Sequence, residues 1–240
     1  MDIPEVLRQG ARLGYGLKHR WLDAPALKNP RIERVRADLP LVVLPDVLPP
    51  ARCFTTRALV DAIDAWVSVI QASQGMLRTL DMGTGSGAAA IALARHGAEV
   101  DAVDLSPHAT RCARINAGLH GVEDRVHVFR GDLFEPVRGR RYDIIVFNPP
   151  YLDGTPEGWL SHAFYGGEDG EVLRRFFAAA PGHLAPEGRV ILSYSSVADT
   201  ERLERLLSAG PWRIRGKSVR DVVAEVITHY LLSWEGARNP

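Results

Sequence analysis

LDMGTGSGAAAIALA, residues 80–94, is the stretch that decides the fold. It begins as a strand, turns through Gly83, Gly85 and Gly87, and continues as an alanine-rich helix. Glycines allow a sharp turn and a close approach of a ligand to the backbone, because they carry no Cβ. The start of the helix also presents unpaired N–H groups to such a ligand. The stretch therefore predicts a nucleotide-type site between a strand and a helix.

The rest of the core shows the same alternation of strands and helices. Ser106 and Pro107 mark one helix start, because serine is a favoured cap and proline is favoured at the first helical position. Alternation of this kind implies a parallel sheet. We expect an α/β fold with a doubly wound, mostly parallel seven-stranded sheet. Strands are expected at 78–82, 99–104, 125–129, 143–147, 189–194, 212–218 and 225–232, and helices at 57–70, 87–97, from 107 onward, 171–184 and 199–208.

The first 45 residues are set apart from this core. Apolar residues recur there at helical spacing, namely Ile3, Val6, Leu7, Leu13 and Leu17. The proline-rich stretch LPLVVLPDVLPP, residues 39–50, marks a connection. We therefore divide the chain into a short helical N-terminal segment, residues 1–45, and a core domain, residues 46–240. The segment is a candidate lid or substrate-recognition element.

The composition argues against several classes of protein. The chain has 240 residues, of which 29 are basic and 29 acidic, and zero net charge argues against broad, unspecific nucleic-acid binding. No apolar run approaches the roughly 18 residues of a membrane span, and the N-terminus lacks a secretory signal, so we expect a cytoplasmic protein. Cys53 and Cys112 form no ligand cluster, and the eight histidines lack metal-binding spacing. We expect two reduced thiols and no metal.

Two aspartates bear on the choice of cofactor. Asp104 follows the glycines by about 20 residues, which is the spacing at which an acidic residue holds the ribose of a bound nucleotide. Asp81, which precedes the glycines, would repel a pyrophosphate but attract a sulfonium and an ammonium group. S-adenosylmethionine (SAM) carries both of these cations. Farther along, in RGDLF, Asp132 is a candidate acceptor for the adenine amino group and Leu133 a candidate backbone donor.

The segment NPPY, residues 148–151, is the candidate catalytic motif. Asn148 offers an amide oxygen, and Pro149 offers a carbonyl oxygen next to Pro150, which has no N–H. Two such acceptors can hold the two hydrogens of a planar nitrogen and stabilise the positive charge that grows as it attacks a methyl group. Tyr151 can stack on the planar group. We interpret the motif as a site that orients an amide or an exocyclic amine.

These motifs, in this order, resemble those of class I SAM-dependent methyltransferases of the HemK/PrmC type, which methylate glutamine side chains of release factors. The similarity spans residues 45–195 and rests on LDMGTGSGAAAIALA, VDAVDLSPHATRCARINA, GDLFEPVRGRRYDIIVFNPPY and YGGEDG. It implies a Rossmann-like fold, with the glycine loop at the methionine part of SAM and NPPY at the target amide. It also implies a threonine beside SAM, here Thr55 or Thr56. Thr84 and Leu105 complete the expected cofactor contacts.

Several acceptors suit the same chemistry. A protein glutamine, an adenine of RNA or DNA and a small-molecule amine all remain open, with Phe54, Trp159 or Phe164 as a second wall for a base. The glycines of YGGEDG either close over the acceptor or simply enter a helix. Compared with two-domain members of the family, the chain is shorter before the core and has SYSS (193–196) in place of an acidic turn. A nicotinamide oxidoreductase and a non-catalytic SAM-binding partner subunit are the alternatives from other classes.

Overall fold

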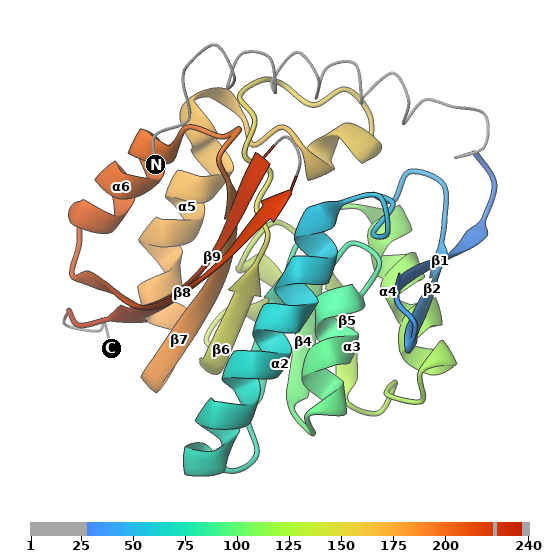
Figure 1. Cartoon of the computed structure of the whole chain (residues 1–240), viewed down its shortest axis with the longest axis horizontal. Helices are drawn as coiled ribbons and strands as arrows, with labels where there is room; N and C mark the ends of the chain where they lie inside the picture. Colours follow the sequence, from blue (N-terminus) through green and yellow to red (C-terminus); the bar gives the residue numbers. More distant parts are fainter. Residues whose placement is uncertain (1–27, 223–224, 237–240) are drawn as a thin grey trace.

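The computed structural model describes residues 28–222 and 225–236. Its main sheet contains β3 (Arg78–Met82), β4 (Glu99–Asp104), β5 (Val126–Arg130), β6 (Tyr142–Phe147), β7 (Leu184–Ser195), β8 (Trp212–Val222) and β9 (Glu225–Trp234). The seven strands lie in the order β5-β4-β3-β6-β7-β9-β8 (Figure 1). The strands from β5 to β7 are parallel, and β9 runs antiparallel to both β7 and β8. The predicted α/β fold with a mostly parallel seven-stranded sheet is confirmed.

Helices cover both faces of this sheet (Figure 1). One face carries α2 (Phe54–Gln74), α3 (Ala88–Arg95) and α4 (Pro107–Leu119), and the other carries α5 (Glu171–Ala179) and α6 (Thr200–Ser208). Alternate residues of β6 belong to two separate cores, Ile144 and Val146 to the first and Ile145 and Phe147 to the second. Successive strand side chains point to opposite faces, so a sheet that is covered twice needs an uninterrupted apolar run.

Local signals explain where the helices begin and end. The Ser106 hydroxyl accepts a hydrogen bond from the Ala109 N–H (3.3 Å), and Pro107 occupies the first position of α4. Helix α5 ends before the predicted boundary at residue 184, because Pro181 lacks the N–H that another α-helical turn needs. The chain continues there as the short 3-10 helix η5 (Ala180–His183). Further 3-10 helices are η2 (Glu135–Val137), η3 (Leu160–Ala163) and η4 (Glu168–Gly170).

Residues 31–43 form a separate antiparallel hairpin of β1 (Arg31–Arg36) and β2 (Leu39–Val43). The expectation of a helical segment is therefore wrong for this stretch. The reason is a tertiary contact: the Asn116 amide accepts from the Val42 N–H (2.8 Å) and donates to the Val42 carbonyl (2.7 Å), as a neighbouring strand would. The helix predicted over the first 17 residues lies outside the described part of the chain, and the domain boundary after residue 45 stays a prediction.

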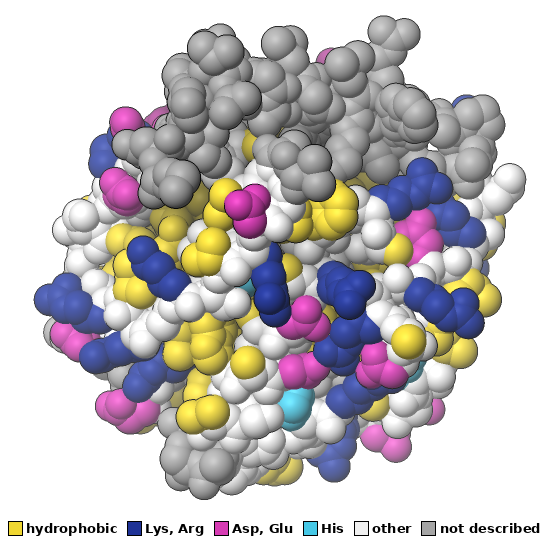
Figure 2. Space-filling model, in the orientation of Figure 1, with side chains coloured by type: hydrophobic (Ala, Val, Ile, Leu, Met, Phe, Trp, Pro, Cys, Tyr) yellow, Lys and Arg dark blue, Asp and Glu magenta, His cyan; other side chains and the backbone are white. Residues whose placement is uncertain are grey.

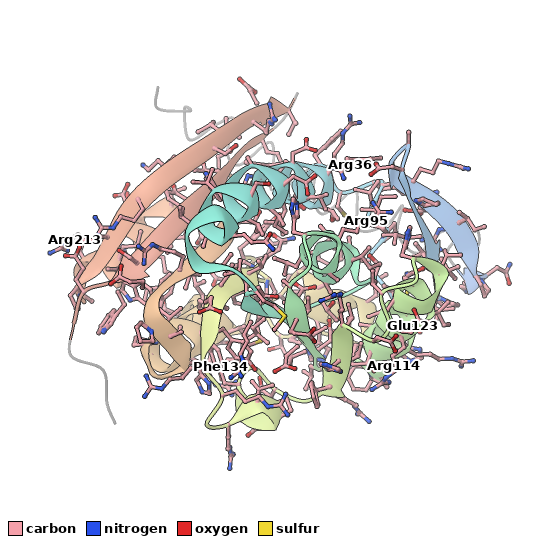
Figure 3. The ribbon with its side chains drawn as sticks, turned by 90° about the horizontal axis from the view of Figure 1, so that it is seen from below. Arg36, Arg95, Arg114, Glu123, Phe134 and Arg213 are labelled. Carbon is pink, nitrogen blue, oxygen red and sulfur yellow. The ribbon has the colours of Figure 1, made fainter. Side chains whose placement is uncertain are left out.

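Ion pairs fasten the hairpin to α2 and α3. Arg36 pairs with Asp38, Asp61 and Asp64, and Arg95 of α3 also pairs with Asp38, at 3.0 Å. Figure 3 shows Arg36 and Arg95 close together where the hairpin meets these two helices. On the face seen in Figure 2, basic and acidic side chains are interspersed, in keeping with the zero net charge of the chain. In residues 28–222 and 225–236, no helix is long and apolar enough to span a membrane.

Candidate functional site

A cavity lies at the carboxyl ends of β3, β4 and β6, where the loops that follow these strands meet. Within the sheet, β3 has β4 as its neighbour on one flank and β6 as its neighbour on the other. The strand order therefore reverses at β3, because the chain first adds β4 and β5 on one flank and then β6 on the other. Ligands of open α/β sheets bind at such a reversal of strand order. The cavity brings together most of the predicted site residues, namely Thr56, Asp81, Gly83, Thr84, Gly85, Asp104, Leu105, Asp132, Leu133, Asn148 and Pro150.

Asp104, the last residue of β4, is held by two backbone N–H groups. One carboxylate oxygen accepts from Gly85 (2.9 Å) and the other from Ser106 (2.8 Å). Burial raises the pKa of this carboxyl, although the two N–H donors and the nearby His162 oppose the rise. A carboxylate offers about four lone-pair positions, so each oxygen can accept a further hydrogen bond. Asp104 is therefore fixed in place with acceptor capacity to spare, as contact with ribose hydroxyls requires.

Asp81 lies beneath the glycine loop and is only 3% exposed. One of its oxygens accepts from the Thr84 hydroxyl (2.7 Å) and from the Ala90 N–H (3.0 Å). Burial nevertheless raises the pKa of the Asp81 carboxyl to about 7, because the two hydrogen bonds offset only part of the desolvation. A cation bound in the cavity would lower this pKa and would be held by the charged form.

The loop after β5 contains the two residues expected to contact adenine. Leu133 has a left-handed backbone, with φ at +46°, which is uncommon for a residue with a side chain and typical of positions under functional constraint. One oxygen of Asp132 accepts from Arg175 of α5 at 2.6 Å. Asp132 therefore faces the cavity with part of its acceptor capacity already used, which sequence reasoning did not predict.

Asn148 follows the buried end of β6 and contributes to the cavity lining. Its amide oxygen is buried and has no hydrogen-bond partner among the residues that the structure describes. Buried polar atoms are almost always paired, since an unpaired acceptor costs about 1–3 kcal/mol. The orphaned oxygen is therefore the strongest indication in the site of a ligand that donates an N–H.

The YGGEDG segment lies directly against NPPY. Leu152 donates to the Phe164 carbonyl and Gly166 donates to the Leu152 carbonyl, both at 2.9 Å, as in a short piece of sheet. A Cβ on Gly166 would lie 2.4 Å from the Pro150 carbonyl oxygen, so no other residue fits without moving the motif. The glycines thus allow two loops to touch, which is a more specific role than entry into a helix.

Two of the predicted cofactor residues lie outside the lining. Gly87 shapes the loop instead: its φ is +85°, and a Cβ there would lie 3.1 Å from the Ala113 Cα of α4. Thr55 is buried, with 4% of its surface exposed, so Thr56 is the threonine that faces the cavity.

Tyr151 also lies outside the lining, and its stacking on the acceptor stays a prediction. Its ring packs edge-on against Tyr194, with 6.1 Å between the ring centroids. Pro149 is buried and likewise does not line the cavity. Tyr165 supplies an aromatic side chain to the lining instead. Of the three residues expected to form a second wall, Trp159 lines the cavity, whereas Phe54 and Phe164 do not.

The wall that contains Trp159 includes a residue that sequence reasoning missed. His162 lines the cavity one turn after Trp159, and their ring centroids are 5.7 Å apart. The Arg130 guanidinium, at the end of β5, also lies over the Trp159 ring, 5.7 Å from its centroid. The aromatic residues of this stretch were the only signal in the sequence, because nothing local indicates that the loop crosses toward β4 and β5.

The cysteines and histidines show no metal centre in the described ranges. No group of three or more histidine, cysteine or acidic side chains there is arranged to hold a metal ion. Neither Cys53 nor Cys112 is part of a disulfide in the part of the chain that the structure describes. Burial raises the pKa of the Cys112 thiol, which packs against the Val42 carbonyl at 3.1 Å.

The doubly wound sheet with its antiparallel β9, the glycine loop after β3 and the acidic end of β4 fit a class I methyltransferase, the class of enzyme that uses SAM. The chain belongs to the methyltransferase small domain family, which matches residues 51–210. The resemblance to the HemK/PrmC type, the enzyme class and SAM as cofactor are thereby confirmed.

Two curated relatives give the comparison more detail. The ribosomal protein uL3 glutamine methyltransferase of Bradyrhizobium diazoefficiens is 44% identical over 135 residues, which cover 52% of this chain and 42% of that protein. The release factor glutamine methyltransferase of Gloeobacter violaceus is 39% identical over 168 residues, which cover 65% of this chain and 56% of that protein. The matched regions thus span about half the length of these relatives.

Solved structures share the fold. The 16S rRNA N2 G1207 methyltransferase RsmC of T. Thermophilus, in complex with AdoMet and guanosine, superposes with a TM-score of 0.62 and 21% identity, covering 84% of this chain and 50% of that one. The E. cuniculi Mtq2-Trm112 complex, described as methylating the termination factor eRF1, gives a TM-score of 0.54 and 25% identity, covering 79% and 99%.

Proposed function

We propose that this chain transfers a methyl group from SAM to the side-chain nitrogen of a protein glutamine. The observation that carries the proposal is the buried Asn148 oxygen, which lacks a partner in the described part of the chain. An amide nitrogen supplies the N–H that this oxygen lacks. The curated relatives, named as glutamine methyltransferases of ribosomal protein uL3 and of release factor, support a glutamine amide as the acceptor.

The cavity residues fit SAM in chemistry and in placement. Asp104 has acceptor capacity for the two ribose hydroxyls, and Asp81 supplies a buried negative charge for a cationic ligand. The backbone of Gly83 and Gly85 would hold the methionine part, and the N–H of Leu133 and the free capacity of Asp132 would be available to adenine. When bound, SAM supplies an electrophilic methyl group that an in-line nucleophile can accept.

The chemical problem that the protein solves is the poor nucleophilicity of an amide nitrogen, whose lone pair is conjugated with the carbonyl. Asn148 accepts one hydrogen of the amide and orients the nitrogen toward the methyl group. We assign the second hydrogen to the Pro149 carbonyl, because Pro149 stands between Asn148 and Pro150, which both line the cavity. Both acceptors gain strength as the nitrogen becomes positive, so they stabilise the transition state more than the bound substrate. As the N–methyl bond forms, the sulfonium–methyl bond would break and S-adenosylhomocysteine would be the leaving product; one of the two protons would then pass from the nitrogen to solvent.

Adenine N-methylation is the second candidate, because Trp159 lines the cavity and offers a stacking surface for a base. A small-molecule amine also suits the two acceptors. A non-catalytic partner subunit would have no use for the Asn148 oxygen. The match to a methyltransferase family argues against a nicotinamide oxidoreductase. We place the activity in the cytoplasm and assign acceptor recognition to residues 1–45 and to the loop at 151–170.

The test is a transfer assay with methyl-labelled SAM and four kinds of acceptor: ribosomal protein uL3, a release factor, an adenine-containing RNA oligonucleotide and a set of small amines. We expect label in a protein acceptor, and none when its target glutamine is replaced by glutamate. Label in the RNA alone would favour the adenine candidate. SAM binding without transfer to any acceptor, including small amines, would favour the partner-subunit alternative.

A further inference from the structure

Arg202, on helix α6, lies among three carboxylates although its side chain is only 8% exposed. Its terminal nitrogen Nη2 lies 2.9 Å from the Asp153 Oδ2 and 3.5 Å from the Asp199 Oδ2, and its Nε lies 3.6 Å from the Asp169 Oδ1. Burying a guanidinium is costly unless the charge is paired and hydrogen-bonded, and an apolar residue of similar size would often be at least as stable. Stability alone therefore does not explain an arginine at this position.

Two of the three carboxylates belong to segments that meet beside the NPPY motif. Asp153 follows the NPPY motif by two residues, and Asp169 lies in the YGGEDG segment. The second oxygen of Asp153 accepts from the Gly170 N–H at 3.1 Å. The Asp153 carboxylate therefore connects the guanidinium to both loops at once.

Close packing supports the same reading. Gly170 has a left-handed backbone, with φ at +60°, and a Cβ there would lie 2.7 Å from the Arg202 Cδ. The loop backbone thus rests directly on the arginine side chain. On the other side, the Tyr194 hydroxyl donates to the Asp199 carbonyl (2.8 Å), and Tyr194 is the residue whose ring contacts Tyr151. Arg202 and its partners therefore contact the segments that pack against NPPY, through Gly170 on one side and Tyr194 on the other.

We infer that Arg202 is a positioning residue for the proposed methyl transfer: it holds residues 151–154 and 166–170 in one arrangement and so keeps the Asn148 acceptor in place. The inference rests on the proposed function for its kinetic consequence, but its structural consequence can be measured without activity. Misplacement of a reacting group by about 1 Å can cost about a hundredfold in rate, even when the altered residue is remote.

The matched pair of variants is Arg202→Met and Arg205→Met. Arg205 lies on the same helix and also approaches Asp199, at 3.5 Å, but it is 62% exposed, and its other ion pair is with Glu201 of the same helix. We expect Arg202→Met to lower kcat by about ten- to a hundredfold while the Kd for SAM changes less than twofold. Arg202→Lys is expected to recover part of the loss by restoring a charge to Asp153. Arg205→Met is expected to behave like the wild type.

Amide hydrogen exchange measured by NMR is the readout that does not need an acceptor. Arg202→Met is expected to speed exchange at Leu152, Gly166 and Gly170, and Arg205→Met is not. If Arg202→Met does not fold, Asp153→Asn tests the same contact from its exposed end, since the amide keeps the bond to Gly170 but loses the charge. Wild-type kcat in the Arg202 variant, or unchanged exchange at these amides, would overturn the inference. Faster exchange with a wild type that methylates no glutamine would leave the inference standing and reject the proposed function.

Discussion

Asn148→Ala is expected to remove most of the activity without lowering the stability of the fold. The Asn148 oxygen has no partner within residues 28–222 and 225–236, so truncation breaks no internal hydrogen bond of that oxygen. It also removes a buried, unsatisfied acceptor whose cost is about 1–3 kcal/mol. The unfolding free energy should therefore stay the same or rise by about 1–2 kcal/mol, a partial recovery of that cost. Loss of one oriented group that stabilises developing charge typically lowers kcat by about a hundredfold or more.

The assay combines three measurements on the same preparations. Steady-state transfer from labelled SAM gives kcat, calorimetry gives the Kd for SAM, and urea denaturation gives the unfolding free energy. Asn148→Gln is the matched control, because it keeps the amide but displaces it by one methylene and should also lose activity. A variant that loses several kcal/mol of stability would show that the amide is paired in the native state. Near-normal kcat in Asn148→Ala would show that NPPY is only a structural turn.

Three further predictions concern groups away from Asn148. Burial raises the pKa of Asp81 to about 7, and cationic SAM should bind only its deprotonated form. The affinity for SAM, measured by calorimetry, should therefore fall about tenfold per pH unit below pH 7. Asp81→Asn should bind SAM without this pH dependence. Burial lowers the pKa of His229 from 6.5 to about 4. Its contribution to stability is therefore complete above pH 6.5 and is lost as the pH falls toward 4, by about 3 kcal/mol, and urea titrations of the wild type and His229→Phe should show the difference. Asn116→Ala breaks hydrogen bonds to both Val42 backbone groups and to the Ser86 carbonyl, and should cost about 3 kcal/mol in the same urea assay; a loss below about 1 kcal/mol would contradict this role.

The sequence predicted those parts of the fold that local signals determine. The strand at 78–82 and the helix start at Ser106 and Pro107 were predicted correctly, because turn glycines, caps and uninterrupted apolar runs act over a few residues. The hairpin at 31–43 was missed, because its edge is completed by a side chain 74 positions away in the chain. No pattern within the segment itself contains that information.

The same distinction applies to the site. Asp104, which ends β4, and Asn148, which follows β6, reach the cavity because the carboxyl ends of parallel strands lie at one edge of the sheet. The contact of the Tyr151 ring with Tyr194 was not predicted, since Tyr194 lies far along the chain. His162 was missed for a similar reason: the loop that carries it is positioned by backbone hydrogen bonds between residues 152–154 and 164–167.

The most direct test of the central claim is tandem mass spectrometry of an acceptor protein, ribosomal protein uL3 or a release factor, after incubation with this chain and SAM. We expect a single added methyl group on the side-chain nitrogen of one glutamine, and its loss when Asn148→Ala replaces the wild type. A methyl group on any other kind of side chain, or one that forms equally well with Asn148→Ala, would contradict the claim that the Asn148 oxygen orients a glutamine amide.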